Sequence, residues 1–327
     1  MKSKLPNIPK LLDRKIYKTG QTRGADDDDI YQNRVSRAST VLIPYSYYDQ
    51  AIASLPTGEK FENGFIVLIT PEEYFDTAHI NSELASKGLE LGKNLLVFYE
   101  TRIQWNSHNV DKLGWSPAKS RTEPLKGQYV ARVSATTSTD EGEKIVRGFR
   151  STKNKGAGIR VYEYASSTTI RECRYQLEAL FWLCKDSIAV SIKNGMSRED
   201  TEIRRSAILA QATEQKLLER KVLQDSRIIN ASGFSICPLC LEELPGDGYF
   251  SKMEQAEGRG VHDLTVTQIN LFHVKELRTG SLNHKPYNVG WGHHHCNVVV
   301  KDSGIEKALT WMSGVIRKNR EAGLFRE

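Results

Sequence analysis

The chain has 327 residues, which is long enough for two domains with separate cores, and 39% of them are apolar, as in ordinary soluble proteins. The net charge of +6 and the pI near 8.9 lean toward polyanionic partners without requiring one. The richest apolar runs, 65–69 and 95–99, are far shorter than the roughly 20 residues of a membrane-spanning helix. The basic start lacks the apolar core of a signal peptide. We therefore expect a soluble cytoplasmic protein with no membrane association.

Residues 1–165 are predicted to form a mixed, mostly β domain. Short runs at 41–43, 65–69 and 95–99 have the length of strands and turn-forming borders, and Pro71 suits the first turn of a helix. A glycine-containing loop with basic side chains either clamps DNA phosphates or is an ordinary solvated loop; its basic residues are Arg147, Arg150, Lys153, Lys155 and Arg160. A second basic stretch near the N-terminus, with Arg14, Lys15, Lys18 and Arg23, is interpreted as an arm along the DNA groove.

Residues 166–228 are predicted to be helical. Between Thr169 and Ile192 apolar residues recur at the spacing of one buried helical face, and Asn194 with Gly195 then breaks the pattern. Ser197 has the character of an N-cap, and a charged helix is predicted to run from there to about residue 225. The apolar positions of the first helix are Ile170, Cys173, Leu177, Leu180, Phe181, Cys184 and Ile188.

The last third of the chain holds two pairs of metal-ligand residues at two-residue spacing. They are Cys237 with Cys240 and His293 with Cys296. Zinc takes Cys and His ligands in a tetrahedron, and an odd total of five cysteines argues against a disulfide framework. Buried thiols and a fortuitous histidine cluster are the alternatives, but six of the eight histidines lie between 262 and 295. The spacing therefore predicts a structural zinc ion, which in zinc-finger peptides contributes roughly 10–16 kcal/mol to folding.

Between and after these pairs lie the residues of a nuclease motif. A strand-like run, 269–273, ends in His273, Asn288 follows in the next segment, and Asn297 comes directly after Cys296. This order and spacing over residues 229–327 resembles the HNH, or ββα-metal, nuclease motif. The resemblance implies that His273 is the general base, that Asn288 is the middle asparagine, and that Asn297 binds the catalytic metal. The whole chain resembles a type II restriction endonuclease with a C-terminal HNH domain.

The chemistry of phosphodiester cleavage agrees with these roles. A histidine that titrates near neutral pH can take a proton from water, and a divalent cation such as Mg²⁺ can neutralise charge on the phosphate. Asn288 would either buttress the loop or orient His273 through its carbonyl. The resembled family usually has Asp directly before the base, where this chain has Phe272. The candidates for the missing metal ligand are, in order, His284, His295 and Glu276, and a degenerate, inactive nuclease is the alternative reading.

Three adjacent histidines need separate assignments. His293 has the spacing of the zinc ligand. His294 and His295 either contact phosphate or metal, or lie on the surface.

The sequence as a whole predicts an α+β protein with three parts. These are a mixed, mostly β DNA-recognition domain (1–165), a helical connector that is also a candidate dimer interface (166–228), and a ββα-metal nuclease domain with a structural zinc ion (229–327). We expect a Mg²⁺-dependent restriction endonuclease from the cytoplasm of a bacterium or archaeon that cuts double-stranded DNA. A homodimer is expected because protein symmetry then matches that of a symmetric site. The alternatives are a modification-dependent HNH endonuclease, a homing or repair nuclease, and a non-catalytic zinc-containing DNA-binding protein.

Overall fold

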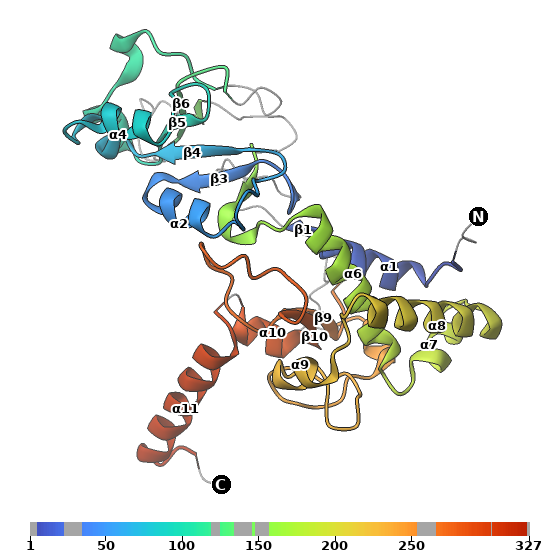
Figure 1. Ribbon diagram of the computed structural model, residues 1–327. Coiled ribbons are helices and arrows are strands. Elements are labelled where there is room, and N and C mark those ends of the chain that lie inside the picture. Colours follow the sequence, from blue (N-terminus) through green and yellow to red (C-terminus); the bar gives the residue numbers. More distant parts are fainter. Residues whose placement is uncertain are drawn as a thin grey trace. The chain divides into compact units, whose positions relative to one another are not determined.

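The computed structural model describes residues 5–22, 35–118, 125–133, 146–147, 157–253, 266–301 and 303–325. Its contacts divide the chain into two compact units, seen in Figure 1. Unit 1 comprises Met1–Thr19, Thr168–Leu277 and Asn283–Glu327, and unit 2 comprises Gly20–Ser167 and Arg278–Leu282. Unit 1 thus contains the first residues of the chain together with its second half. The division into three functional parts that the sequence predicts stays a prediction.

Unit 2 is built on a six-stranded sheet in the order β7-β6-β5-β4-β3-β8, which is parallel except for the β6–β7 pair. The predicted strands at 41–43, 65–69 and 95–99 are confirmed as β3, β4 and β5. The strands are β3 (Val41–Pro44), β4 (Phe65–Ile69), β5 (Leu95–Tyr99), β6 (Tyr129–Arg132), β7 (Val146–Arg147) and β8 (Ile159–Arg160). A separate antiparallel pair joins β1 (Gln21–Thr22) to β2 (Val35–Ser36).

Both faces of this sheet are buried, which explains why its central strands are apolar throughout. Ile66 and Leu96 pack into a cluster on one face, and Val67, Ile69 and Val97 pack into another cluster. Parallel neighbours require crossover connections, and these contain α2 (Tyr48–Ala53), α3 (Pro71–Phe75), α4 (Ile80–Ser86) and α5 (Arg102–Ser107). The predicted helix start at Pro71 is confirmed: Thr70 and Glu73 form a capping box around it. The predicted mixed α+β class is confirmed.

Unit 1 combines helices with one β-hairpin followed by a helix. The hairpin pairs β9 (Ile269–His273) with β10 (Val289–His293), and α10 (His294–Val300) begins directly after it. The remaining helices are α1 (Lys10–Lys18), α6 (Ser167–Trp182), α7 (Ser187–Lys193), α8 (Arg198–Glu214), α9 (Arg220–Asp225) and α11 (Ile305–Glu321). None of the helices in the described part of the chain combines the length and apolarity that crossing a bilayer requires.

The two long helices predicted for residues 169–225 are each interrupted. The first ends at Trp182 and α7 begins at Ser187. In the turn between them, the carboxylate of Asp186 accepts the backbone N–H of Gly246 at 2.7 Å. The second ends at Glu214, and Lys216 then adopts a left-handed φ of 55°. The predicted N-cap is confirmed, since Ser197 accepts the N–H of Asp200 at 3.0 Å.

The core of unit 1 lies between α6 and the hairpin. Phe181 of α6 packs edge-on against Tyr249, which packs in the same way against Trp291 of β10. The indole N–H of Trp291 donates to the carbonyl of Leu177 at 2.8 Å, so this buried polar group is satisfied. The helical segment predicted as a connector is therefore the packing partner of the hairpin.

Candidate metal centre and cleavage site

The two predicted ligand pairs meet in one cluster. The ligand atoms of Cys237, Cys240, His293 and Cys296 all lie within 4.8 Å of one another. The first pair sits on a tight turn, in which the N–H of Leu241 donates to the carbonyl of Cys237 at 2.9 Å. His293 ends β10 and Cys296 lies in the first turn of α10. The hairpin and helix therefore bring together residues that are more than fifty positions apart.

Hydrogen bonds within this cluster favour the thiolate form of one cysteine, the form that binds a metal ion. Burial raises the pKa of Cys237, but hydrogen bonds from the His293 ring and from neighbouring backbone amides outweigh it and hold the pKa at about 6. Burial and the nearby Cys237 thiolate raise the pKa of Cys240 and of Cys296. Sγ of Cys240 lies 3.3 Å from Nδ1 of His293. Three sulfur atoms and one imidazole nitrogen form a donor set that suits a zinc ion.

The predicted base, His273, is part of a buried chain of hydrogen bonds. Its Nε2 lies 3.0 Å from Nδ1 of His284, and Nε2 of His284 lies 3.0 Å from Oγ1 of Thr19. His284 is fully buried and His273 is only 9% exposed. Because both nitrogens of His284 are engaged, binding a metal would require this ring to give up one of these contacts.

The middle asparagine holds the loop between β9 and β10. Asn288 is buried, its Oδ1 accepts the N–H of Lys275 at 2.6 Å, and its Nδ2 donates to the carbonyls of Asn283 (2.6 Å) and Lys275 (3.3 Å). Of the two roles considered for it, this geometry favours buttressing the loop.

Asn288→Ala is therefore expected to lower the free energy of unfolding by about 2–4 kcal/mol, because it leaves buried backbone groups unsatisfied. Chemical denaturation measures this change. Asn319→Ala, which removes one hydrogen bond on the surface helix α11, is the matched control and should cost less than about 1 kcal/mol. Equal losses in the two variants would contradict the buttressing role.

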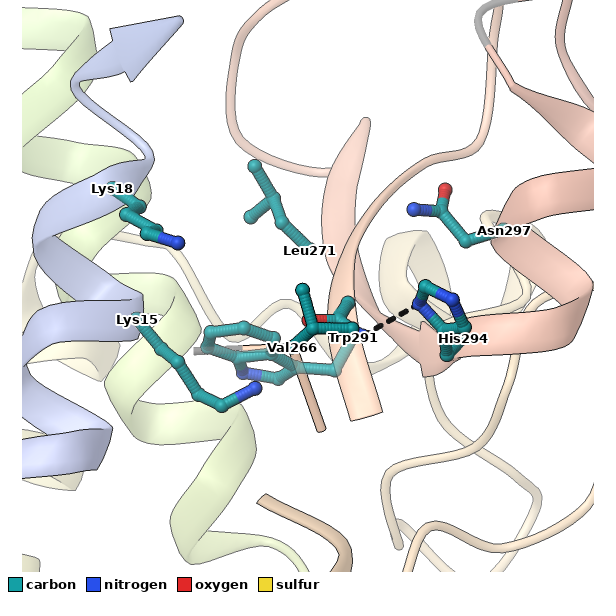
Figure 2. Close-up of a pocket in the computed structure, with 8 residues that line it drawn as sticks. Lys15, Lys18, Val266, Leu271, Trp291, His294 and Asn297 are labelled. Atoms are coloured by element: carbon teal, nitrogen blue, oxygen red, sulfur yellow. Dashed lines mark hydrogen bonds between the residues drawn. The ribbon is translucent and has the colours of Figure 1, made fainter. Parts of the chain in front are cut away.

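A pocket of about 270 Å³ opens beside the hairpin (Figure 2). It brings together Asn297 and His294 of α10, Asn270 of β9 and two lysines of α1, and Nδ2 of Asn270 lies 3.2 Å from Nδ1 of His294. Burial and the charges of His295 and Lys15 lower the pKa of His294. The lining residues are Lys15, Lys18, Val266, Asn270, Leu271, Trp291, His294 and Asn297, so His273 is not among them.

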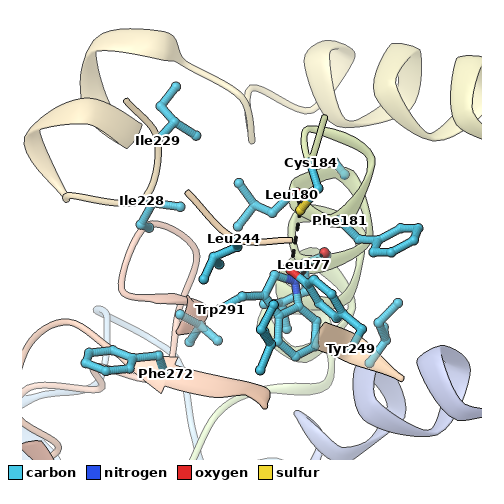
Figure 3. Packing of buried hydrophobic residues seen from close by; sticks show 14 of the residues in the cluster. Leu177, Leu180, Phe181, Cys184, Ile228, Ile229, Leu244, Tyr249, Phe272 and Trp291 are labelled. Carbon is cyan, nitrogen blue, oxygen red and sulfur yellow. Dashed lines mark hydrogen bonds between the residues drawn. The ribbon is translucent and has the colours of Figure 1, made fainter. Parts of the chain in front are cut away.

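Position 272, where the resembled family has Asp, faces the core of unit 1. Phe272 is fully buried among the apolar residues around Trp291 (Figure 3). It lies so close to the facing strand that a Cβ added at Gly292 would be 2.5 Å from its ring. A carboxylate at this position would be buried in an apolar environment.

Phe272→Asp is thus expected to destabilise unit 1 by more than about 4 kcal/mol rather than to supply a metal ligand. Thermal unfolding and metal-dependent cleavage would be measured together. Phe272→Leu, which keeps the site apolar, should remain folded. A stable Phe272→Asp variant with increased cleavage would contradict this assignment.

The other predicted site residues are placed as follows. His295 is exposed and stacks on His293 with ring centroids 5.3 Å apart, and Glu276 pairs with Lys307 at 2.7 Å. Arg160 lies 3.5 Å from Glu163 in unit 2. Arg147 lies in β7, whereas Arg150, Lys153 and Lys155 are outside the described residues. Asn270 carries no motif signal, and only the fold reveals its place in the pocket.

One family of known proteins matches this chain. A family model described as BstXI restriction endonuclease matches residues 14–294, which reach from α1 to the start of α10. Searches of curated proteins and of solved structures give no match. The protein is thus a type II restriction endonuclease, a DNA-binding hydrolase that cuts double-stranded DNA at specific sites. It belongs to the BstXI restriction endonuclease family.

Proposed function

We propose that this endonuclease cuts DNA with an HNH-type site that is stapled by zinc and served by a second, catalytic divalent cation such as Mg²⁺. The family match supports sequence-specific DNA cleavage. The observation that carries the finer proposal is the strand–loop–strand–helix segment with a Cys₃His cluster at its last junction. The order of His273, Asn288 and Asn297 along that segment supports the same reading.

The zinc ion would be held by Cys237, Cys240, His293 and Cys296. Its role is structural: it would fix the end of β10 and the first turn of α10 to the turn at 237–240. Asn297 follows the last of these ligands, so the metal would set the position of its side chain at the pocket.

His273 would take the proton of the attacking water. Its contacts support this role, because they fix the ring and limit the tautomers of both histidines. If Oγ1 of Thr19 accepts from Nε2 of His284, then Nδ1 of His284 accepts from Nε2 of His273. In that arrangement Nδ1 of His273 holds the lone pair that a base requires.

The catalytic cation would polarise the scissile phosphate and neutralise charge in the transition state. Asn297 is the proposed ligand with the most support, since its amide lines the pocket. His284 and His295 stay predicted as further ligands of this cation. The basic residues Arg147, Arg150, Lys153, Lys155 and Arg160 stay predicted contacts of the DNA backbone.

The first test is cleavage of supercoiled plasmid with and without added Mg²⁺. Linear product is expected only with a catalytic cation. Ca²⁺ serves as the control that permits binding, and titration with a chelator should stop the reaction before zinc leaves the protein. Cleavage at full rate after all added divalent ions are removed would argue against this mechanism. Comparing modified with unmodified plasmid separates a modification-dependent enzyme from an ordinary restriction enzyme.

We also propose that two copies act together, because a symmetric site is then cut on both strands. The helix α11 offers a surface for this contact. Trp311 is 61% exposed and Ile316 is 41% exposed, and Leu309 and Val315 are each 39% exposed on the same helix.

Trp311→Glu is accordingly expected to shift the protein from dimer to monomer, because a buried carboxylate would oppose pairing. Sedimentation measures the mass of each variant. Ser313→Glu adds the same charge at another exposed position of α11 and should leave the mass unchanged. A monomeric wild-type protein would exclude this surface as a stable interface.

A further inference from the structure

The pocket beside the hairpin has a chemistry that the roles assigned so far do not explain. Two of its residues, Lys15 and Lys18, come from α1 at the other end of the chain. None of the described residues that line it is Asp or Glu, and the remaining polar ones among them are Asn270, His294 and Asn297. A cavity with two cations, two amides and one imidazole complements an anion.

The position of Lys15 shows that this part of α1 is integral to the site. Lys15 is only 4% exposed, and its Nζ donates to the carbonyl of Ile269 at 2.5 Å, at the start of β9. This contact fixes α1 beside the strand that leads to His273. Lys18 lies one turn further along the same helix and is half-buried, with its side chain at the pocket (Figure 2).

We infer that this pocket binds a phosphodiester of the DNA backbone, with Lys18 of α1 supplying positive charge to it. Asn297, the proposed metal ligand, lines the opposite side in Figure 2. The bound phosphate is therefore the scissile one or its neighbour. This inference rests on the proposed function for the cleavage step, whereas the binding of phosphate does not depend on it. It makes α1 a part of the cleavage site.

The test compares Lys18→Ala with Lys10→Ala in the full-length protein. Lys10 is exposed on the same helix and does not line the pocket, so both variants lose one charge from α1. DNA affinity is measured with Ca²⁺ in place of Mg²⁺ at several salt concentrations. Lys18→Ala should reduce the slope of log affinity against log salt by about 0.9, as expected for one lost phosphate contact. Its single-turnover cleavage should fall about 10–100-fold, and Lys10→Ala should match the wild type in both measurements.

Zinc content and melting temperature show whether each variant is folded. If Lys18→Ala does not fold, the test is repeated with Lys18→Gln, which keeps most of the aliphatic stem. Wild-type slope and wild-type cleavage in a folded Lys18 variant would overturn the phosphate site. His273→Ala would still report separately on the proposed mechanism. Conversely, a changed slope in a protein that cuts with no divalent ion would retain the phosphate site and remove the proposed function.

Discussion

His273→Ala abolishes DNA cleavage but leaves DNA binding intact, if this side chain is the general base. A positioned acid or base contributes about 10²–10⁴-fold to a rate, so the single-turnover rate should fall by at least two orders of magnitude. The binding constant, measured with Ca²⁺, should change little because the ring is 9% exposed and offers little surface to DNA. Gel analysis of plasmid cleavage and a binding titration measure the two quantities.

The matched control is His79→Asn, since His79 is an exposed histidine of unit 2 in a left-handed conformation that Asn tolerates. It should cut at the wild-type rate. Thr19→Val tests the positioning chain, because it removes the hydroxyl that pairs with His284 while keeping the side-chain volume. It should lower the cleavage rate and change its dependence on pH, with little effect on zinc content. Cleavage by His273→Ala at the wild-type rate would refute the assignment.

If the Cys₃His cluster holds a structural zinc ion, removing that ion should unfold unit 1. Structural zinc contributes roughly 10–16 kcal/mol in zinc-finger peptides, which matches or exceeds the roughly 5–15 kcal/mol net stability of a folded protein. Cys240→Ser is the most informative change, since Cys240 is the exposed member of the cluster and its replacement creates no cavity in the core. We expect less than one zinc per chain, a much lower melting temperature and no cleavage. Metal analysis and thermal unfolding check these outcomes.

Cys184→Ala is the control for this experiment. Cys184 is buried outside the cluster, and burial raises the pKa of its thiol to about 12, so it is neutral at pH 7. Its replacement should cost stability but leave one zinc per chain. A wild-type protein without zinc, or a Cys240→Ser variant with unchanged melting temperature, would contradict a structural zinc ion at this cluster.

Local patterns in the sequence predicted the parts of the protein that depend on local chemistry. The apolar runs predicted β3, β4 and β5, and the spacing of Cys237, Cys240, His293 and Cys296 predicted residues that do come together. Three features depend on distant contacts and had no local signal. They are the burial of Lys15 against β9, the pairing of His284 with Thr19, and the burial of Phe272 in the core. The hydrogen bond from Gly246 to Asp186, in the turn between α6 and α7, is a distant contact of the same kind.

Unit 1 is formed by segments that are separate in the sequence. This affects when unit 1 can fold during synthesis and which segments can be exchanged between related enzymes. Its first helix leaves the ribosome about 150 residues before the elements on which it packs, so unit 1 can finish folding only late in synthesis. In the sequence, residues 20–167 are inserted between two segments of unit 1, and they carry the strands of the unit 2 sheet, which can form earlier. A fragment cut at residue 229 would lack α1 and α6, and with them Thr19, Lys15 and the packing partner of the hairpin. If the inserted segment reads the DNA sequence, as predicted for residues 1–165, exchanging specificity between relatives should succeed by replacing this segment, not by fusing a C-terminal piece to another protein.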